Sequence, residues 1–227
     1  MNTIYDLDKT NLLTGKKRFN TGIYVELKDP KFHKENGKPN FSEIVFKILD
    51  KYNYKNKSDN IIIQCFDAEE LRRIRQELKS NLTLVQLLYP ENLDNYFLYW
   101  NSKEGLAEIA KFADGIGPEI SQLITWDSKN KNSVKESEFY NNTKKLGLFM
   151  HPYTFRIDSL PAYVDDFVEL LDLYIKKLKI DGLFSDFPDL AVKYIELNTQ
   201  NQINSSNNLK SIYYFILPLF LIFSNLL

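Results

Sequence analysis

The stretch IIIQCFDAEELRRIRQELKSNLTLVQLL (residues 61–88) is expected to fold as a strand, a helix and a second strand. Short apolar runs stand at both ends, and a longer amphipathic segment lies between them. Two strands joined through a helix of this length are typical of a parallel pair, because a parallel connection must cross over one face of the sheet. The stretch therefore indicates an α/β fold whose parallel sheet is covered by helices.

The same alternation extends from residue 22 to residue 197. Strands are expected at 22–28, 61–66, 82–88, 113–118, 146–152 and 180–186, and helices at 41–54, 68–79, 104–112, 134–144, 160–178 and 188–197. In the fifth helix, Phe167, Leu170, Leu171 and Tyr174 share one face. Six units favour a (β/α)8 TIM barrel with about six of its eight strands present, since a closed barrel needs eight strands and about 250 residues.

A doubly wound nucleotide-binding domain is the alternative for such a chain. No glycine-rich phosphate loop follows the first expected strand, so this alternative has little support. Lys and Arg total 29 against 30 for Asp and Glu in 227 residues. The near-zero net charge argues against a nucleic-acid partner. The single cysteine, Cys65, lies in an apolar run and is interpreted as a small buried side chain.

The two ends of the chain differ in character. The first twenty residues contain no apolar stretch of the secretory type. Residues 1–197 are assigned to one partial barrel domain, 198–211 to a polar linker, and 212–227 to a hydrophobic tail. Short polar residues precede this tail, so it is predicted to be a signal for a GPI glycolipid anchor, with a short membrane tail anchor as the alternative. Membrane association through the tail and a location at the cell surface or outside the cell follow as expectations.

Polar residues at the C-terminal ends of the expected strands are the candidates for a functional site. Glu26 and Lys28 lie two residues apart and therefore share a face of the first strand. A carboxylate suits a hard divalent cation, and a neighbouring ammonium group can neutralise phosphate charge. On its own the pair is more often a solvated strand edge.

Three further polar residues stand in otherwise apolar runs: Gln64, Gln86 and His151. A glutamine there can simply complete a hydrogen bond within the barrel, and a lone histidine is more often structural than catalytic. His33, in the expected loop after the first strand, has no partner at metal-ligand spacing and is interpreted as a surface residue. The sequence SDFPD (185–189) is expected to begin a helix with Pro188 and Asp189 in its first turn.

Taken together, these segments resemble the glycerophosphodiester phosphodiesterase family, in the branch similar to bacterial periplasmic enzymes. The resemblance covers about residues 12–195 and rests on segments in a fixed order: GIYVELKDPKFH, IIIQCFDAEELRRIRQEL, LVQLL, ADGIGP, HPYTFR and DGLFSDFPDLAVKY. It implies a (β/α) barrel that hydrolyses glycerophosphodiesters to glycerol 3-phosphate and an alcohol. The implied cofactor is calcium or another divalent cation such as magnesium, and the implied partner is the small-molecule substrate.

The resemblance also implies roles for particular residues. Glu26 matches the family's metal-binding glutamate, and Lys28 matches the lysine that faces the phosphate, which makes it the catalytic candidate. Gln64 and His151 match positions that line the substrate pocket. Val25 stands where this branch often has proline.

The sequence departs from the family at one point. The family opens with a His-Arg-Gly strand end, a Glu-x-Asp strand and a second histidine, and no His-Arg dipeptide occurs in this sequence. The chain is therefore expected to begin partway through the catalytic domain and to be inactive by itself. A non-catalytic, membrane-anchored surface protein that keeps the barrel shell is the alternative function. A phospholipase C barrel specific for phosphatidylinositol is a third, less supported one.

Overall fold

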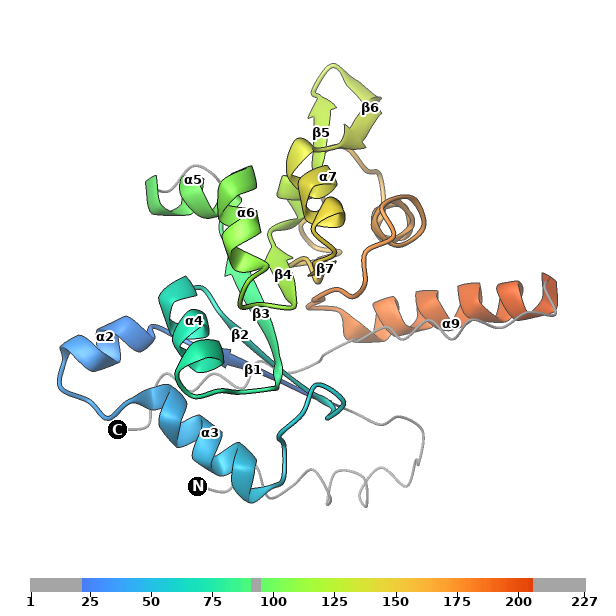
Figure 1. The fold of residues 1–227 in the computed structure, drawn as a ribbon. Helices are drawn as coiled ribbons and strands as arrows, with labels where there is room; N and C mark the ends of the chain where they lie inside the picture. Colours follow the sequence, from blue (N-terminus) through green and yellow to red (C-terminus); the bar gives the residue numbers. More distant parts are fainter. Residues whose placement is uncertain (1–21, 91–94, 206–227) are drawn as a thin grey trace.

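The computed structural model describes residues 22–90 and 95–205, with the backbone alone for 95–97, 131–132 and 199–205 (Figure 1). The hydrophobic tail expected at 212–227, the expected linker residues 206–211 and the first twenty residues lie outside the described part. Within the part that is described, no helix is both long and apolar enough to span a membrane.

Five parallel strands form the main sheet. They are β1 (Ile23–Leu27), β2 (Ile61–Cys65), β3 (Thr83–Leu88), β4 (Gly115–Pro118) and β7 (Phe149–Met150), and they lie side by side in that order. Each coincides with an expected strand. The parallel sheet inferred from the sequence is therefore confirmed.

The sixth expected strand, 180–186, is not a regular strand, and the fifth is regular over only two residues. The two segments still pair through the backbone: the amide of Phe155 donates to the carbonyl of Phe184 at 2.8 Å, and Phe184 in turn donates to Pro152 at 3.0 Å. Phe155 and Ser185 form an isolated parallel bridge. Pro152 has no amide hydrogen to donate, which helps to interrupt the ladder at this point.

Helices follow the strands as the alternation predicts. They are α3 (Phe41–Lys51), α4 (Ala68–Gln76), α6 (Lys103–Ile109), α7 (Glu138–Lys145), α8 (Phe167–Leu171) with its continuation as the π-helix η2 (Asp172–Lys177), and α9 (Pro188–Ser205). Side chains at the N-caps of α4, α6, α7 and α8 accept bonds from the first free amides: Asp67, Ser102, Ser137 and Asp166.

Several boundaries differ from the expectation. Helix α9 continues to Ser205, so residues 198–205, expected as a linker, are helical. The helix expected from residue 134 begins at Glu138, because the preceding residues belong to β6 (Asn130–Glu136), which forms an antiparallel hairpin with β5 (Ile124–Asp127).

Three short elements had no clear sequence signal. They are α2 (Pro30–Glu35), α5 (Asn95–Asn101) and the 3-10 turn η1 (Ile120–Leu123). Helix α2 lies in the stretch expected to be a loop, and it buries none of its residues, so it lacks the apolar stripe on which a sequence-based prediction depends. Pro30 at its first position fixes the backbone angle that starts it.

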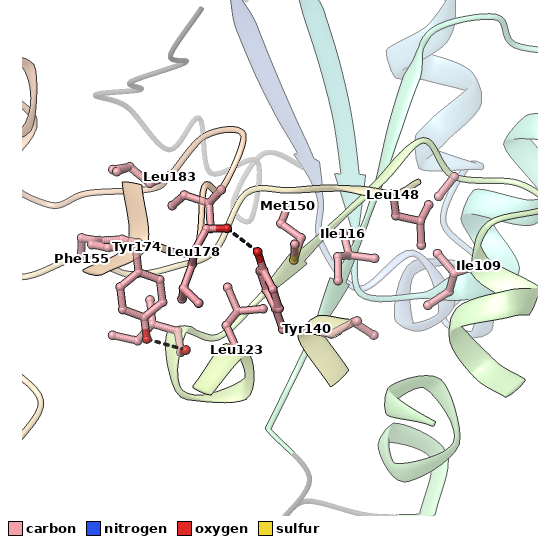
Figure 2. Close-up of a cluster of buried hydrophobic side chains, with 14 of the residues drawn as sticks. Ile109, Ile116, Leu123, Tyr140, Leu148, Met150, Phe155, Tyr174, Leu178 and Leu183 are labelled. Carbon is pink, nitrogen blue, oxygen red and sulfur yellow. Dashed lines mark hydrogen bonds between the residues drawn. The ribbon is translucent and has the colours of Figure 1, made fainter. Parts of the chain in front are cut away.

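The larger hydrophobic core lies between the sheet and its helices. Figure 2 shows the part of it that contains Ile116 and Met150 from the strands and Ile109 from α6. Two buried tyrosines satisfy their hydroxyls on backbone carbonyls: Tyr140 donates to Leu178, and Tyr174 donates to Ile120 at 2.7 Å (Figure 2). Tyr174 and the other three residues expected on one face of the fifth helix are all buried, as predicted.

A second, smaller cluster lies on the opposite face of the sheet. It contains Tyr24, Ile62, Val85 and Phe184, with Phe149 and Tyr153 packed against it. Two glycines of β4 make room for it: a Cβ on Gly115 would lie 2.4 Å from the ring of Phe149, and one on Gly117 would lie 2.6 Å from Leu87. We call this surface the inner face of the sheet.

Candidate functional site

The predicted pair Glu26 and Lys28 lies at the C-terminal end of β1, on the inner face. Lys28 Nζ is 3.5 Å from Glu26 Oε1. The glutamate side chain is only 10% exposed and the lysine side chain 37%. Burial raises the pKa of Glu26, and Lys28 partly offsets this by charge and hydrogen bonding. The pair is thus a half-buried charge pair and not a fully solvated strand edge.

Gln64 is brought beside Glu26. The two are register partners on β1 and β2, so their side chains leave the same face of the sheet. Gln64 is 3% exposed, and its Oε1 has no hydrogen-bond partner among the described residues. A buried amide oxygen without a donor is costly, which marks this position as one where a ligand atom or water would be favourable.

Gln86 has a different place. It is the register partner of Cys65 and faces the helices, not the inner face. Its Nε2 donates to the carbonyls of Phe66 and Leu87, both at 2.9 Å. It therefore has the structural role that the sequence left open, tying β3 to the end of β2.

His151 also lies on the inner face, directly after β7. Its Nδ1 is 3.0 Å from the hydroxyl of Tyr24, its ring packs against Phe149 at 4.6 Å, and a Cβ on Gly182 would meet it at 2.7 Å. It is 5% exposed, and burial lowers its pKa to about 3. The imidazole is therefore neutral at physiological pH and shares a hydrogen bond with the hydroxyl of Tyr24.

His33 is not in a loop as expected, but in the short helix α2. Its ring stacks on Phe41 at 5.5 Å with an interplanar angle of 21°. This contact gives His33 a packing role between α2 and α3.

Sequence reasoning missed four residues at the same end of the sheet. Phe66, Tyr89 and Glu119 are the first residues after β2, β3 and β4, and Tyr153 follows β7 and bridges to Glu119. Each is an even number of residues from an inward-facing position of its own strand, so each belongs to the inner face. Counting this parity along the predicted strands would have found them. We call Phe66, Tyr89, Glu119 and Tyr153 the rim cluster.

The aromatic members of the rim cluster contact one another. Phe66 stacks on Tyr89 with centroids 3.9 Å apart and a 12° interplanar angle, and Phe66 meets Tyr153 edge-on at 6.2 Å. The Tyr153 hydroxyl donates to the carbonyl of Leu88 at 2.9 Å. All four residues are only partly buried. The three rings thus form an aromatic cluster at the same end of the sheet as the Glu26–Lys28 pair.

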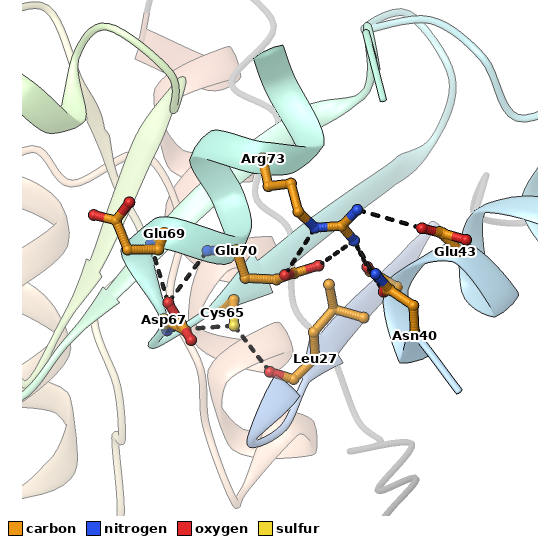
Figure 3. A network of polar contacts seen from close by, with 9 residues as sticks. Leu27, Asn40, Glu43, Cys65, Asp67, Glu69, Glu70 and Arg73 are labelled. Atoms are coloured by element: carbon orange, nitrogen blue, oxygen red, sulfur yellow. Dashed lines mark hydrogen bonds and ion pairs between the residues drawn. The ribbon is translucent and has the colours of Figure 1, made fainter. Parts of the chain in front are cut away.

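A polar network holds the ends of β1 and β2 in place (Figure 3). The thiol of Cys65 donates to the carbonyl of Leu27 at 3.0 Å, and the amide of Asp67 donates back to the sulfur at 3.3 Å. Cys65 is fully buried, as expected, and burial raises the pKa of its thiol. This contact fixes the residue that lies between Glu26 and Lys28.

Arg73 of α4 joins the same region to α3. Its guanidinium donates to both oxygens of Glu70, at 2.8 and 3.1 Å, to Asn40 at 2.9 Å, and to Ser42 (Figure 3). Glu43 lies 3.5 Å from it. The arginine thereby ties the helix that follows β1 to the helix that follows β2.

The described residues fit only part of a divalent-metal site. Glu26 is a buried carboxylate with a raised pKa, a state that a nearby cation would relieve. Among residues 22–90 and 95–205 there is no group of three His, Cys, Asp or Glu side chains placed to hold a metal ion. Calcium takes six to eight oxygen ligands, so Glu26 would be one of several.

A parallel sheet covered by helices, with polar residues gathered where its strands end, is the arrangement found in (β/α) barrels. A solved structure titled as a glycerophosphoryl diester phosphodiesterase from Agrobacterium tumefaciens has the same fold. It matches with a TM-score of 0.50 and 16% identity over 82% of this chain and 61% of that one. The fold class predicted from the sequence is confirmed.

Sequence comparison identifies the family. The model of the glycerophosphoryl diester phosphodiesterase family matches residues 10–190, so the chain belongs to this family. The glycerophosphodiester phosphodiesterase of Haemophilus influenzae is 35% identical over 200 residues, 81% of this chain and 54% of that protein. The protein of the same name from Treponema pallidum is 32% identical over 199 residues, 80% and 55% of the two chains. The chain spans about half the length of these relatives.

Proposed function

We propose that this chain supplies part of the active site of a metal-dependent phosphodiesterase that hydrolyses glycerophosphodiesters to glycerol 3-phosphate and an alcohol. The observation that carries the proposal is the half-buried Glu26–Lys28 pair at the C-terminal end of β1, where (β/α) barrels place their reactive groups. The names of the curated relatives support the substrate class.

In this proposal Glu26 is a ligand of a divalent cation, calcium or a similar ion such as magnesium. A carboxylate oxygen is the donor that such hard cations prefer. When bound, the cation would stabilise charge on the phosphoryl group. Its other oxygen ligands would come from water, from the phosphate and from residues outside the part of the protein that the structure describes.

Lys28 has the complementary role. Its ammonium group is 37% exposed and lies beside the carboxylate, so it can reach a phosphate oxygen while Glu26 holds the cation. A fixed positive charge next to the phosphate favours the increase in negative charge that accompanies displacement. Lys28 is therefore the proposed catalytic residue in this chain.

Gln64 and His151 have supporting roles in the proposal. Gln64 offers an unpartnered amide oxygen next to Glu26 and is proposed to contact the substrate or a bound water. His151 is proposed to shape the floor of the pocket through its bond to Tyr24. A neutral, nine-tenths buried imidazole is a poor candidate for transferring protons to the substrate.

The experiment separates metal binding from turnover. In a form of the protein that supplies the remaining metal ligands, titration of calcium by calorimetry should show binding that Glu26→Gln weakens about tenfold or more, because the neutral amide loses the charge that attracts the cation. Glu35→Gln is the matched control, since Glu35 is an exposed carboxylate on α2. Lys28→Ala should leave metal affinity unchanged.

The same variants have a second use in any form of the protein that hydrolyses glycerophosphocholine. There, Glu26→Gln should reduce metal affinity and activity together, and Lys28→Ala should lower turnover with the metal retained. Unchanged metal affinity in Glu26→Gln would remove Glu26 from the metal site and the proposal with it.

A further inference from the structure

Positive charge gathers at the end of the sheet where the strands begin. In a parallel sheet, each helix that leads into a strand ends at this side of the molecule. Helices α3, α4 and α7 lead into β2, β3 and β7, and η2 leads into the segment 180–186, so all four end opposite to the Glu26–Lys28 pair. Six exposed lysines stand at these helix ends, and we call them the basic end: Lys51, Lys79, Lys144, Lys145, Lys177 and Lys179.

The charge of the basic end is not cancelled by its neighbours. No ion pair joins any of these six lysines to another residue of the described part. Three nearby carboxylates already face other cations: Asp50 faces Lys55, Asp114 faces Lys57 and Arg75, and Glu108 faces Lys111. The remaining acids are Asp59 and Asp181, which accept backbone amides, and the exposed Glu77. An excess of positive charge is left.

A lysine near a helix C-terminus has an ordinary structural explanation. Its ammonium group compensates the partial negative charge of the last carbonyls. Lys144 fits this explanation, because it donates to the carbonyl of Lys179 at 3.1 Å, and Lys177 donates to the carbonyl of Val134 at 2.9 Å. Both groups keep their charge while making these bonds.

Lys79 and Lys179 do not fit it, because they occupy backbone positions that favour glycine. Their φ angles are 53° and 52°, in the left-handed region. The two helix ends close in the same way, since the amide of the following residue donates back into the helix at 3.2 Å: Ser80 to Ile74, and Ile180 to Tyr174. A side chain at such a position costs stability that glycine would not cost. Backbone geometry therefore does not account for these two lysines.

The distribution of the lysines indicates the kind of partner. They are spread over four helix ends, so a partner that meets them together must be broad and negatively charged. An anionic lipid surface has this character and attracts each lysine that comes near it. Leu146, which is 37% exposed directly after Lys144 and Lys145, adds an apolar side chain suited to the lipid interface.

The opposite end of the molecule has the opposite charge. Acidic residues stand at the N-caps or in the first turns of five helices there: Asp67, Glu69, Glu70, Glu104, Glu138, Asp166, Glu169 and Asp189. An anionic surface would repel this end while it attracts the other. The charges thus favour one orientation of the molecule on such a surface.

We propose that the basic end is a docking surface for an anionic lipid bilayer. Docking there directs the end of the sheet that carries Glu26 and Lys28 away from the lipid and toward the solvent. The inference concerns the opposite end of the sheet and does not depend on the proposed phosphodiesterase activity.

The test is a vesicle-binding assay on the chain of residues 1–227. Vesicles of phosphatidylcholine are compared with vesicles in which about one third of the lipid is phosphatidylglycerol, and bound protein is separated by flotation. The chain should prefer the anionic vesicles. Its binding should weaken as the salt concentration rises from about 0.05 M to about 0.5 M, because salt screens the attraction.

The decisive variant combines Lys79→Gly with Lys179→Gly. Each lysine removed should weaken binding to the anionic vesicles about fivefold, so the pair should weaken it about twentyfold to thirtyfold. Glycine suits the left-handed backbone, so the variant should unfold at the same temperature as the parent chain or at a higher one. Loss of binding is thereby separated from loss of the fold.

The matched control combines Lys34→Gln with Lys38→Gln. It removes the same charge from exposed positions on and after α2, which follows the C-terminal end of β1. It should leave the vesicle affinity within about twofold of that of the parent. All variants retain residues 212–227, so differences between them report the lysines and not the hydrophobic tail.

Equal weakening in the control would attribute binding to total charge and overturn the inference. So would the absence of binding to anionic vesicles, or binding that neither salt nor the glycine pair changes. A double-stranded oligonucleotide is titrated in parallel as the other polyanion. Tighter binding to it than to the vesicles would assign the basic end to nucleic acid instead of lipid.

Discussion

Tyr24 and His151 are 127 residues apart in the chain, and the hydroxyl of Tyr24 lies 3.0 Å from Nδ1 of His151. Tyr24 belongs to β1, one edge strand of the main sheet, and His151 directly follows β7, the other edge strand. The ring of Phe184 adds a second contact, 4.9 Å from that of Tyr24. Side chains of opposite edges can meet only if the sheet curls around its inner face, which is the curvature of a barrel.

The His151 bond predicts a pH dependence of stability. The pKa of His151 is lowered to about 3 by burial, from an ordinary value near 6.5. Between these values the unfolded chain binds a proton that the folded chain does not. The free energy of unfolding should therefore fall as pH drops below about 6.5, by about 1.4 kcal/mol per pH unit at most, with no contribution above that pH.

The measurement compares urea unfolding of the parent chain and His151→Gln at pH 7, 6 and 5. The glutamine still offers Tyr24 an acceptor but does not titrate. The stability advantage of the parent over the variant should shrink by about 2 kcal/mol between pH 7 and pH 5. Parallel pH profiles would show that His151 is not the buried neutral base described above.

Residues 1–227 by themselves should release glycerol 3-phosphate from glycerophosphocholine no faster than background. Acid–base transfer typically contributes about 10²- to 10⁴-fold to such reactions. The sequence has two histidines. His151 is buried and neutral, and His33 packs on Phe41, so neither is placed to transfer a proton at Lys28. The assay includes added calcium, with the fold checked by circular dichroism. Robust calcium-dependent release that disappears in Glu26→Gln would contradict this prediction.

Arg73→Ala should lower the free energy of unfolding by about 1–3 kcal/mol, because it leaves the half-buried carboxylate of Glu70 without its partner and separates α3 from α4. Solvent screening keeps the loss below that of a fully buried pair. Lys111→Ala, which removes an exposed pair with Glu108 on one surface, should change stability little. Chemical denaturation of both variants checks the prediction, and equal effects would refute the bridging role of Arg73.

The thiol of Cys65 should not react with a disulfide reagent in the folded chain. It is fully buried, its pKa is raised, and it donates to the carbonyl of Leu27. Reaction requires an exposed thiolate. One thiol per chain should titrate in guanidinium chloride and none without it over minutes. Rapid labelling in native buffer would show that the end of β1 opens readily.

Much of the fold was predictable from the chain. Apolar runs bounded by amphipathic segments placed all five strands of the main sheet, and their order along the chain gave the parallel topology. Helix α2, which buries none of its residues, was missed, and so were α5 and the β5–β6 hairpin. The sequence also predicted a regular strand at 180–186, whereas this segment pairs irregularly with the residues after β7. Pro152 and isolated backbone bridges decide this pairing, and hydrophobic periodicity does not reveal it.

The candidate site, like the fold, was predictable from the sequence only in part. The sequence by itself determined the Glu26–Lys28 pair, because two residues apart on a strand must share a face. Only the tertiary structure decided that Gln64 lies beside Glu26, that Gln86 turns toward the helices, and that His151 is a buried partner of Tyr24. The rim cluster likewise arises from the ends of four strands. Such relations depend on strand register and sheet curvature, which are set by packing between residues far apart in the chain and leave no local pattern in the sequence.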